Sequence, residues 1–206
     1  MEKIIELLKE SLPKVHGWCS IEKATHLVEF ILAHKPEVCV EIGVFGGSSL
    51  IPQALALKEN NKGMLYGIDP WSNEASLECM KDEANAAWWG QLDMEQIYAH
   101  ACDNIKNFEI EKFCTLIRDK AENVVNQFPD GSVDLLHIDG NHSEELSYKD
   151  AVLYLPKVRV GGHILFDDIW WMEHNEVTTR KAILHLLETC SKIDIVSDCM
   201  ILKKES

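Results

Sequence analysis

The sequence predicts a doubly wound α/β protein built on a mostly parallel, seven-stranded sheet. Apolar stretches rich in β-branched residues alternate with segments of helical period, a pattern typical of a parallel sheet covered by helices on both faces. The length of 206 residues fits about one domain, and no internal repeat divides it. We therefore expect a single domain over residues 1–206.

Five parallel strands are expected, and in chain order they are Val38–Ile42, Met64–Ile68, Phe113–Ile117, Val133–Ile138 and His163–Phe166. Gly161 and Gly162 open the fifth of them. Two further short strands are predicted in residues 193–204, separated by Ser197 and Asp198, a two-residue connection compatible with an antiparallel hairpin. One antiparallel strand near the C-terminus therefore closes the sheet.

Helices are predicted between the strands, and residues 1–35 hold N-terminal helices, the last of which runs from the expected N-cap Ser20 to His34. The other expected helices are Ser48–Glu59, Glu122–Phe128, Ser143–Leu155 and Val177–Cys190. Residues 71–107 are long for a crossover between strands. They form either an ordinary helical crossover or a lid over the carboxyl edge of the sheet, where open α/β folds bind ligands.

The net charge and the cysteine pattern restrict the classes of partner that the protein can bind. Twenty Lys and Arg against 34 Asp and Glu give a formal charge of −14, which disfavours nucleic acid and anionic membrane surfaces. The seven cysteines show no CxxC spacing, and no apolar stretch has the pattern of a signal peptide or a membrane span. We expect a cytoplasmic protein that acts on a small-molecule substrate. A homodimer is one possible oligomeric state.

A glycine turn, EIGVFGGSS (residues 41–49), follows the first predicted strand and opens a helix. Glycines let a ligand approach the backbone, and a helix N-terminus offers N–H groups to a carboxylate or phosphate. A dinucleotide fingerprint would need glycine where the chain has Glu41, and a phosphate-binding P-loop would need a lysine. A turn that serves only strand–helix packing is the alternative.

Asp69 ends the second predicted strand. From that position a carboxylate can accept two ribose hydroxyls of a bound nucleoside, although an Asp before a Pro is also an ordinary turn former. Together with the glycine turn, Asp69 predicts a pocket for an adenosine-bearing ligand with an amino-acid-like or phosphate-like end.

Three carboxylates follow the fourth and fifth predicted strands: Asp139, Asp167 and Asp168. The first and fourth strands of a doubly wound sheet are neighbours at the switch point, so we expect these carboxylates to converge beside the glycine turn. Such a group needs a cation, and all-oxygen ligation suits Mg²⁺ or another hard divalent ion. A capping role for Asp167 or Asp168 is the alternative. His142 is either a general base or a hydrogen-bonded surface residue.

The motifs EIGVFGGSS, GIDPW, RDKAENV, HIDGNH and GGHILFDDIWW, in this order, resemble those of the class I S-adenosylmethionine-dependent methyltransferases. The resemblance covers about residues 17–203 and is to small-molecule O-methyltransferases of the macrocin, cephalosporin-hydroxylase-like and catechol types. It implies the Rossmann-like methyltransferase fold and S-adenosylmethionine as cofactor.

The resemblance also implies roles for single residues. It places the methionine part of the cofactor against Glu41, Gly43, Gly46, Gly47 and Ser49. It places the ribose at Asp69 and the adenine at Asp119, Lys120 and Ala121. Asp139, Asp167 and Asp168 match the metal ligands of Mg²⁺-dependent members, and His142 stands where catechol-type enzymes place a lysine base. Asn141 departs from the Asp-Gly-Asp of macrocin-type sequences.

The expected function is methyl transfer from S-adenosylmethionine to a hydroxyl of a sugar or phenolic acceptor. Asp139 and His142 are the expected catalytic residues, assisted by a divalent cation. The pairs Trp88-Trp89 and Trp170-Trp171 either stack on the acceptor or pack structurally. Two other functions stay open: an NAD(P)-dependent oxidoreductase and a catalytically silent nucleotide-binding protein.

Overall fold

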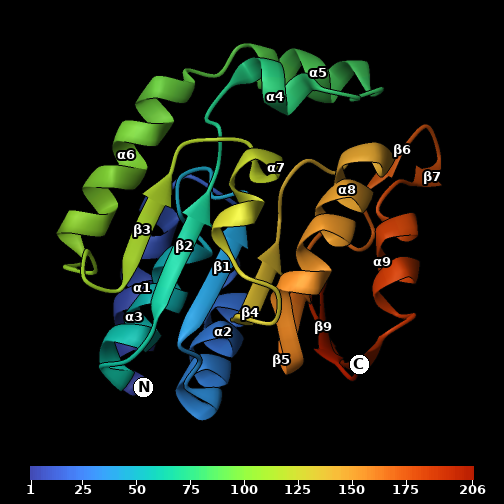
Figure 1. Ribbon diagram of the computed structural model, residues 1–206. Helices are drawn as coiled ribbons and strands as arrows, with labels where there is room; N and C mark the ends of the chain where they lie inside the picture. The colour runs from blue at the N-terminus through green and yellow to red at the C-terminus, as the bar shows by residue number, and fades with distance from the viewer.

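The computed structural model describes residues 1–206, and a seven-stranded sheet runs through its centre (Figure 1). The strand order is β3-β2-β1-β4-β5-β9-β8, and β9 pairs antiparallel with both of its neighbours. The strands are β1 (Val38–Ile42), β2 (Met64–Ile68), β3 (Cys114–Ile117), β4 (Val133–Ile138), β5 (Val158–Phe166), β8 (Cys190–Val196) and β9 (Cys199–Lys204). The predicted fold class, with one antiparallel strand near the C-terminus, is confirmed.

Helices cover both faces of the sheet, because strand residues alternate between two apolar clusters. One cluster joins Cys39 and Leu135 to helices α1 (Glu2–Ser11), α2 (Ile21–His34), α3 (Leu50–Asn60) and α6 (Met94–Asn107). The other cluster joins Val40 and Leu136 to α7 (Ala121–Val124), α8 (Glu144–Tyr154) and α9 (Arg180–Leu186). Ser20 caps α2 as predicted, since its side chain accepts the backbone N–H of Lys23.

The fifth strand begins earlier than predicted. Gly161 and Gly162 lie inside β5, where the register with β4 shifts between Val133 and Leu135. The glycines therefore form an irregularity within the strand, because Gly161 has a φ of +76° and a side chain on Gly162 would press on the Arg159 carbonyl. The first residues of β5 still pair with β4 on the other side of this shift.

The last predicted helix is shorter than expected. Residues before it form a small hairpin that the pattern did not predict, β6 (Met172–Glu173) with β7 (Glu176–Val177). The predicted helix over Glu122–Phe128 is α7 followed by a 3₁₀ turn at Val125–Gln127. The hairpin predicted near the C-terminus is confirmed. Its strands are β8 and β9, and its turn is at Ser197 and Asp198.

Residues 71–107 fold into three helices rather than one crossover helix. Helices α4 (Asn73–Leu77) and α5 (Glu83–Gly90) lie above the carboxyl ends of the strands (Figure 1), and neither buries a residue in the core. Helix α6 returns along the sheet and contributes Ile97, Ala101 and Ile105 to the core. The crossover interpretation holds for α6, whereas a lid role for α4 and α5 stays a prediction.

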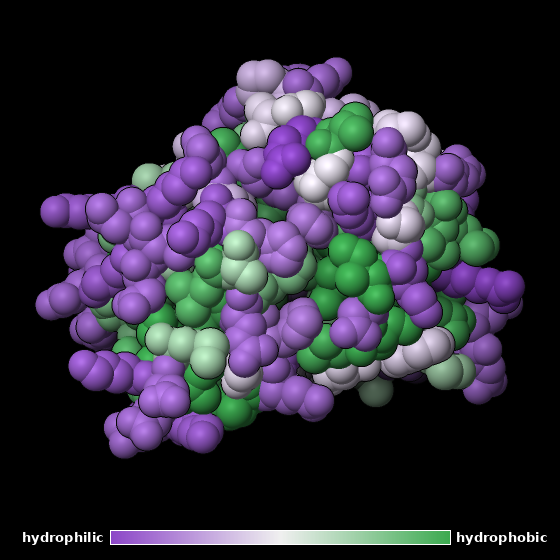
Figure 2. Space-filling view, turned by 90° about the horizontal axis from the view of Figure 1, so that it is seen from below, coloured by the Kyte–Doolittle hydropathy of each residue, from purple (hydrophilic) through white to green (hydrophobic).

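The opposite end of the molecule, at the amino ends of the strands, is a mixture of hydrophilic side chains and small apolar areas (Figure 2). None of the helices combines the length and apolar character that a membrane span requires.

Candidate cofactor and catalytic site

A cavity of about 550 Å³ opens at the carboxyl ends of β1, β2, β4 and β5, beneath α4 and α5. This volume suits a small organic ligand. The predicted site residues that line it are Gly43, Ser49, Asp69, Lys120, Ala121, Asp139, His142 and Asp168. The predicted residues that do not line it are Glu41, Gly46, Gly47, Asp119 and Asp167.

Gly43 is required by the crossing of two backbone segments. Its φ is +85°, and a Cβ there would lie 1.9 Å from the Asp139 carbonyl oxygen. The residue thus keeps the glycine turn against the end of β4, which is the packing role that the sequence left open. A side chain at Gly46 would likewise overlap the His16 carbonyl. Gly46 does not line the cavity, so its expected contact with the cofactor stays a prediction.

Asp69 is held by the glycine turn itself. Its Oδ2 accepts the backbone N–H groups of Val44 and Phe45 at 3.0 and 2.9 Å, and its Oδ1 accepts that of Trp71 at 2.7 Å. Burial raises the pKa of Asp69, while these three hydrogen bonds oppose the shift. A carboxylate offers about four lone-pair positions. Asp69 therefore has room for one further donor, rather than for the two ribose hydroxyls expected.

Glu41 lies beneath the cavity and supports it from behind. Its fully buried carboxylate accepts Ser49 Oγ and Gln53 Nε2, both at 2.6 Å. These bonds tie the end of β1 to the first turn of α3. The expected contact of Glu41 with the cofactor is therefore replaced by a structural role one layer below it.

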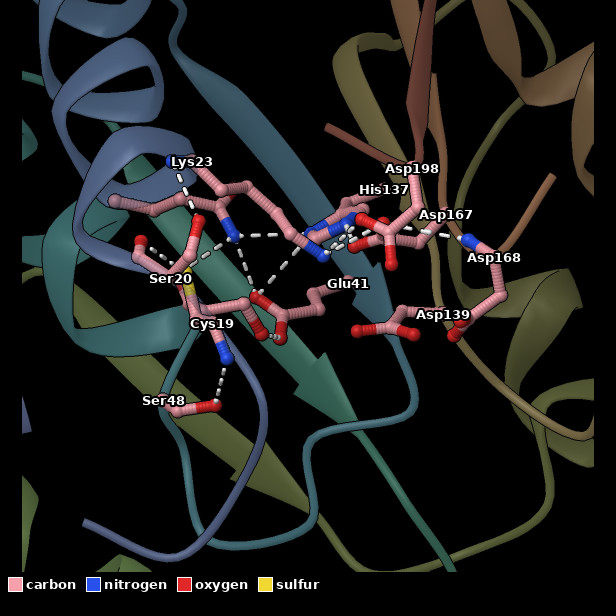
Figure 3. A network of polar contacts seen from close by, with 12 residues as sticks. Cys19, Ser20, Lys23, Glu41, Ser48, His137, Asp139, Asp167, Asp168 and Asp198 are labelled. Carbon is pink, nitrogen blue, oxygen red and sulfur yellow. Dashed lines mark hydrogen bonds and ion pairs between the residues drawn. The ribbon is translucent and has the colours of Figure 1, made fainter. Parts of the chain in front are cut away.

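Asp167 belongs to the same buried side of the sheet (Figure 3). Its carboxylate lies 2.7 Å from Lys23 Nζ and 3.1 Å from His137 Nε2, and Lys23 also pairs with Asp198 at 3.1 Å. Burial by itself would raise the pKa of Asp167, but His137 and Lys23 hold it well below its usual range. Burial opposes charge on the His137 imidazole, but the carboxylates of Asp167 and Glu41 raise its pKa to about 10.

Asp167 does not line the cavity and is paired within the fold, so its role as a metal ligand beside the other two carboxylates stays a prediction. Glu41 is in register with His137, and Asp167 follows Phe166 at the end of β5 on the side of Leu165. All three polar side chains face α2 and α3, because side chains of a strand alternate between its faces. This alternation along the strands could have been used to predict from the sequence that the three side chains share one face. The position of Lys23 at the start of the apolar stripe of α2 could likewise have indicated a buried cation.

Asp139, His142 and Asp168 form a separate cluster at the cavity surface. His142 Nε2 lies 2.9 Å from Asp168 Oδ2 and 3.8 Å from Asp139 Oδ1, and one ligand atom from each residue lies within 4.8 Å of the others. Burial opposes charge on the imidazole, but the two carboxylates raise the pKa of His142 to about 10. Burial and the charge of Asp167 raise the pKa of Asp139 to about 7.

The segment predicted to hold adenine reaches the cavity in part. Lys120 and Ala121 line it, and Lys120 Nζ pairs with Glu78 at 2.5 Å. Asp119 turns away, because its Oδ1 accepts the Lys120 backbone N–H and the Asn123 amide. Asp119 therefore holds the loop that leads into α7 and does not line the cavity.

Asn141 is a functional residue that the motif comparison treated only as a departure. Its amide nitrogen lies within hydrogen-bond distance of the carbonyl oxygens of Ala75, Ser76 and Glu78. An aspartate could not donate these bonds. Asn141 thus fastens α4 over the end of β4, which makes this part of residues 71–107 a fixed roof of the cavity.

Aromatic side chains form one wall of the cavity mouth. Trp18 stacks on Phe45 with ring centroids 5.2 Å apart and meets Trp88 at 5.5 Å, and Trp88 meets Trp89 at 5.0 Å. We call these four residues the aromatic wall. Trp171 lines the cavity on the side of His142, with ring centroids 4.5 Å apart, whereas its neighbour Trp170 lies outside.

The fold and this site define an α/β protein with a cavity at the carboxyl edge of its sheet, the place where open α/β folds bind small ligands. A family described as "Methyltransferase domain" matches residues 40–169, and the chain belongs to this family. The resemblance predicted from the motifs is confirmed at this level.

Proteins that are similar in sequence to this chain include plant proteins. Tricin synthase 1 of Oryza sativa subsp. japonica is 31% identical over 133 residues, which are 64% of this chain and 45% of the rice protein. Flavonoid 3',5'-methyltransferase of Vitis vinifera is 27% identical over 137 residues, which are 64% of this chain and 47% of that protein. The matches thus span about half the length of these relatives.

Solved structures confirm the fold. An O-methyltransferase from Bacillus cereus in complex with SAH superposes with a TM-score of 0.68 at 14% identity, covering 99% of this chain and 91% of the other. The O-methyltransferase TomG from Streptomyces achromogenes, in complex with SAM, gives 0.64 at 15% identity, with 100% and 89% covered.

Proposed function

We propose that this protein transfers a methyl group from S-adenosylmethionine to a hydroxyl of a small phenolic-type acceptor. One observation carries the proposal: a single cavity joins the glycine turn and Asp69 to the cluster of Asp139, His142 and Asp168. A donor site and a group able to receive a proton thus open into the same space. Membership of the methyltransferase-domain family supports the choice of reaction, and similarity to a protein named flavonoid 3',5'-methyltransferase supports the choice of acceptor.

The residues around Asp69 are suited to hold the cofactor. The remaining lone pair of Asp69 can accept one ribose hydroxyl, and Lys120 with Ala121 lies where the resemblance implies the adenine. The backbone at Gly43 and the Ser49 side chain border the space for the methionine part. The chain keeps this space open from below, because Glu41 holds Ser49 from the buried side.

The reaction needs alignment more than activation, because the sulfonium already activates the methyl group. The acceptor oxygen forms a bond to the methyl carbon as the sulfur–methyl bond breaks, and sulfur keeps the electron pair. The hydroxyl proton leaves to the cluster of Asp139, His142 and Asp168, whose imidazole stands between two carboxylates. Asp139, whose pKa is raised to about 7, is the member of the cluster best matched to accept that proton, because a pKa of about 10 keeps the His142 ring protonated near neutral pH.

A divalent cation fits the cluster but not the three-aspartate set. Nitrogen Nε2 of His142 is buried and makes no hydrogen bond, although Asp168 Oδ2 is 2.9 Å away. Asp167 is unavailable, since Lys23 and His137 occupy its carboxylate. When bound, a cation held by the cluster would lower the pKa of an acceptor hydroxyl.

Calorimetric titration with S-adenosylhomocysteine tests the donor half of this proposal, with NAD⁺ as the control ligand. We expect saturable binding of S-adenosylhomocysteine at one site and no heat with NAD⁺. Binding of NAD⁺ alone would favour the oxidoreductase, which shares the fold class. An incubation of the protein with labelled S-adenosylmethionine and a panel of flavonoids, catechols and sugars then tests the acceptor. Binding of S-adenosylhomocysteine without methyl transfer to any acceptor would instead favour the catalytically silent nucleotide-binding protein.

A further inference from the structure

The nitrogen Nε2 of His142 is close to two carboxylates and bonded to neither. It is buried, it lies 2.9 Å from Asp168 Oδ2 and 3.8 Å from Asp139 Oδ1, and it has no partner in hydrogen-bond geometry. A buried polar atom without a partner costs free energy, so such atoms in a native fold indicate a missing ligand. One ligand atom from each of His142, Asp139 and Asp168 lies within 4.8 Å of the others, so the three can reach one ion.

The distances agree with a shared ion. Two ligand atoms at about 2.1 Å from one ion, at right angles, lie about 3.0 Å apart, and wider angles give larger separations. The 3.8 Å separation in the cluster falls in this range, and the 2.9 Å separation lies just below its lower end. A direct hydrogen bond would instead require the N–H to point along the line to the oxygen.

Contacts outside the cluster hold His142 in place. The Thr178 hydroxyl donates to the His142 backbone carbonyl at 2.5 Å, and the Trp171 indole packs on the imidazole. Both residues come from the segment around the β6–β7 hairpin, which the chain adds after β5. Metal-binding histidines depend on such neighbours for the orientation of the ring.

Asp167 is kept out of the cluster by the chain's own cations. Lys23 Nζ and His137 Nε2 contact different oxygens of its carboxylate, and all three side chains are buried. Recruiting Asp167 to an ion would leave Lys23 and His137 as buried charges with a lost partner, which is costly. The position of a third oxygen ligand is therefore taken by the imidazole of His142.

We propose that His142 Nε2, Asp139 and Asp168 together bind one divalent transition-metal ion, with His142 as a ligand in place of the third aspartate. The role of this ion in catalysis rests on the proposed function. An imidazole nitrogen suits Mn²⁺, Co²⁺ or Ni²⁺ better than Mg²⁺, which prefers oxygen and keeps its water. A nitrogen bound to an ion cannot accept a proton, so this assignment excludes Nε2 as the general base.

Mn²⁺ is the probe for the test, because its electron paramagnetic resonance reports on directly bound nitrogen. We expect one Mn²⁺ per chain, nitrogen modulation in the pulsed spectrum, and at least about tenfold tighter binding than Mg²⁺. In His142→Gln the nitrogen signal disappears and Mn²⁺ affinity falls about tenfold or more, while Mg²⁺ affinity changes much less. His163→Gln is the matched control and keeps both, because His163 packs against Phe30 and His34 of α2 and does not line the cavity.

A wild-type Mn²⁺ complex without coupled nitrogen would overturn the assignment, as would unchanged Mn²⁺ affinity in a folded His142→Gln protein. Titration of S-adenosylhomocysteine into the same samples separates this inference from the proposed function. Nitrogen coupling together with no cofactor binding would leave the metal site standing and remove the methyltransferase proposal. Cofactor binding with no nitrogen coupling would do the reverse.

Discussion

Asp167 and Asp168 are adjacent in the chain, and their carboxylates lie in opposite environments. Asp167 is 1% exposed and ion-paired with Lys23 and His137 from two other elements. The Asp168 side chain is 28% exposed, borders the cavity and contacts His142 without a well-formed hydrogen bond. A carboxylate whose partners all come from the protein contributes to the fold, whereas one with unsatisfied neighbours is available to a ligand.

The two regions should respond differently to substitution. We call Lys23, Glu41, His137 and Asp167 the buried network, and Asp139, His142 and Asp168 the cavity cluster. Changes in the buried network should act on the free energy of unfolding. Changes in the cavity cluster should act on turnover and leave the fold intact.

The largest effect is expected for Asp168→Asn in the cavity cluster. The amide keeps the size of the side chain and removes its charge, so turnover should fall about 10²- to 10⁴-fold. The measurement is formation of S-adenosylhomocysteine with the acceptor found by screening, beside a urea titration. Turnover within threefold of wild type, in a protein of unchanged stability, would break the distinction between the two regions.

Lys23→Met should be the largest change in stability. Asp167 would keep only His137 and Asp198 would lose its partner, so the free energy of unfolding should fall by about 3–5 kcal/mol. Lys62→Met is the matched control, because Lys62 pairs with Glu37 on the surface, and its loss should cost at most about 1 kcal/mol. Equal losses in the two variants would show that the buried network adds nothing to the fold.

The pH dependence of the free energy of unfolding should reveal the contribution of charged His137 to the buried network. Its pKa rises from 6.5 in the unfolded chain to about 10 in the fold, since Asp167 and Glu41 outweigh the effect of burial. The charged ring therefore stabilises the fold fully below pH 6.5, and this contribution is lost as the pH rises toward 10.

Thermal unfolding measured from pH 6 to pH 10 checks this expectation. The melting temperature of the wild type should decrease across that range, and His137→Gln should be less stable at pH 6 with a flatter curve. A variant curve parallel to that of the wild type would assign the pH dependence to other groups.

The smallest effect is expected at the aromatic wall. Trp18 and Trp170 are both 65% exposed, but only Trp18 lines the cavity. Trp18→Ala should raise the KM for an aromatic acceptor about two- to tenfold by removing a stacking partner, while Trp170→Ala leaves it unchanged. Initial-rate kinetics on both variants provide the comparison. Equal KM values would assign the aromatic wall to packing alone.

Much of the fold and part of the site could be predicted from local pattern. The alternation of strands and helices, the Ser20 cap and the turn at Ser197 are short-range features, and each appears as expected. Asp69, Asp139 and His142 border the cavity because strand ends of a doubly wound sheet meet at one edge. The hairpin β6–β7 was missed, since two-residue strands have too little pattern to detect.

The order of the elements, the glycine turn and the acidic residues at the strand ends follow from local sequence, because each depends on neighbours a few positions apart. Which carboxylate is paired with cations of the protein itself depends on long-range packing. Lys23 and Asp167 are 144 residues apart, and their contact exists because α2 packs against the end of β5. Burial makes such a pairing strong enough to remove Asp167 from the cavity, and His142 is left beside Asp139 and Asp168 to complete the site.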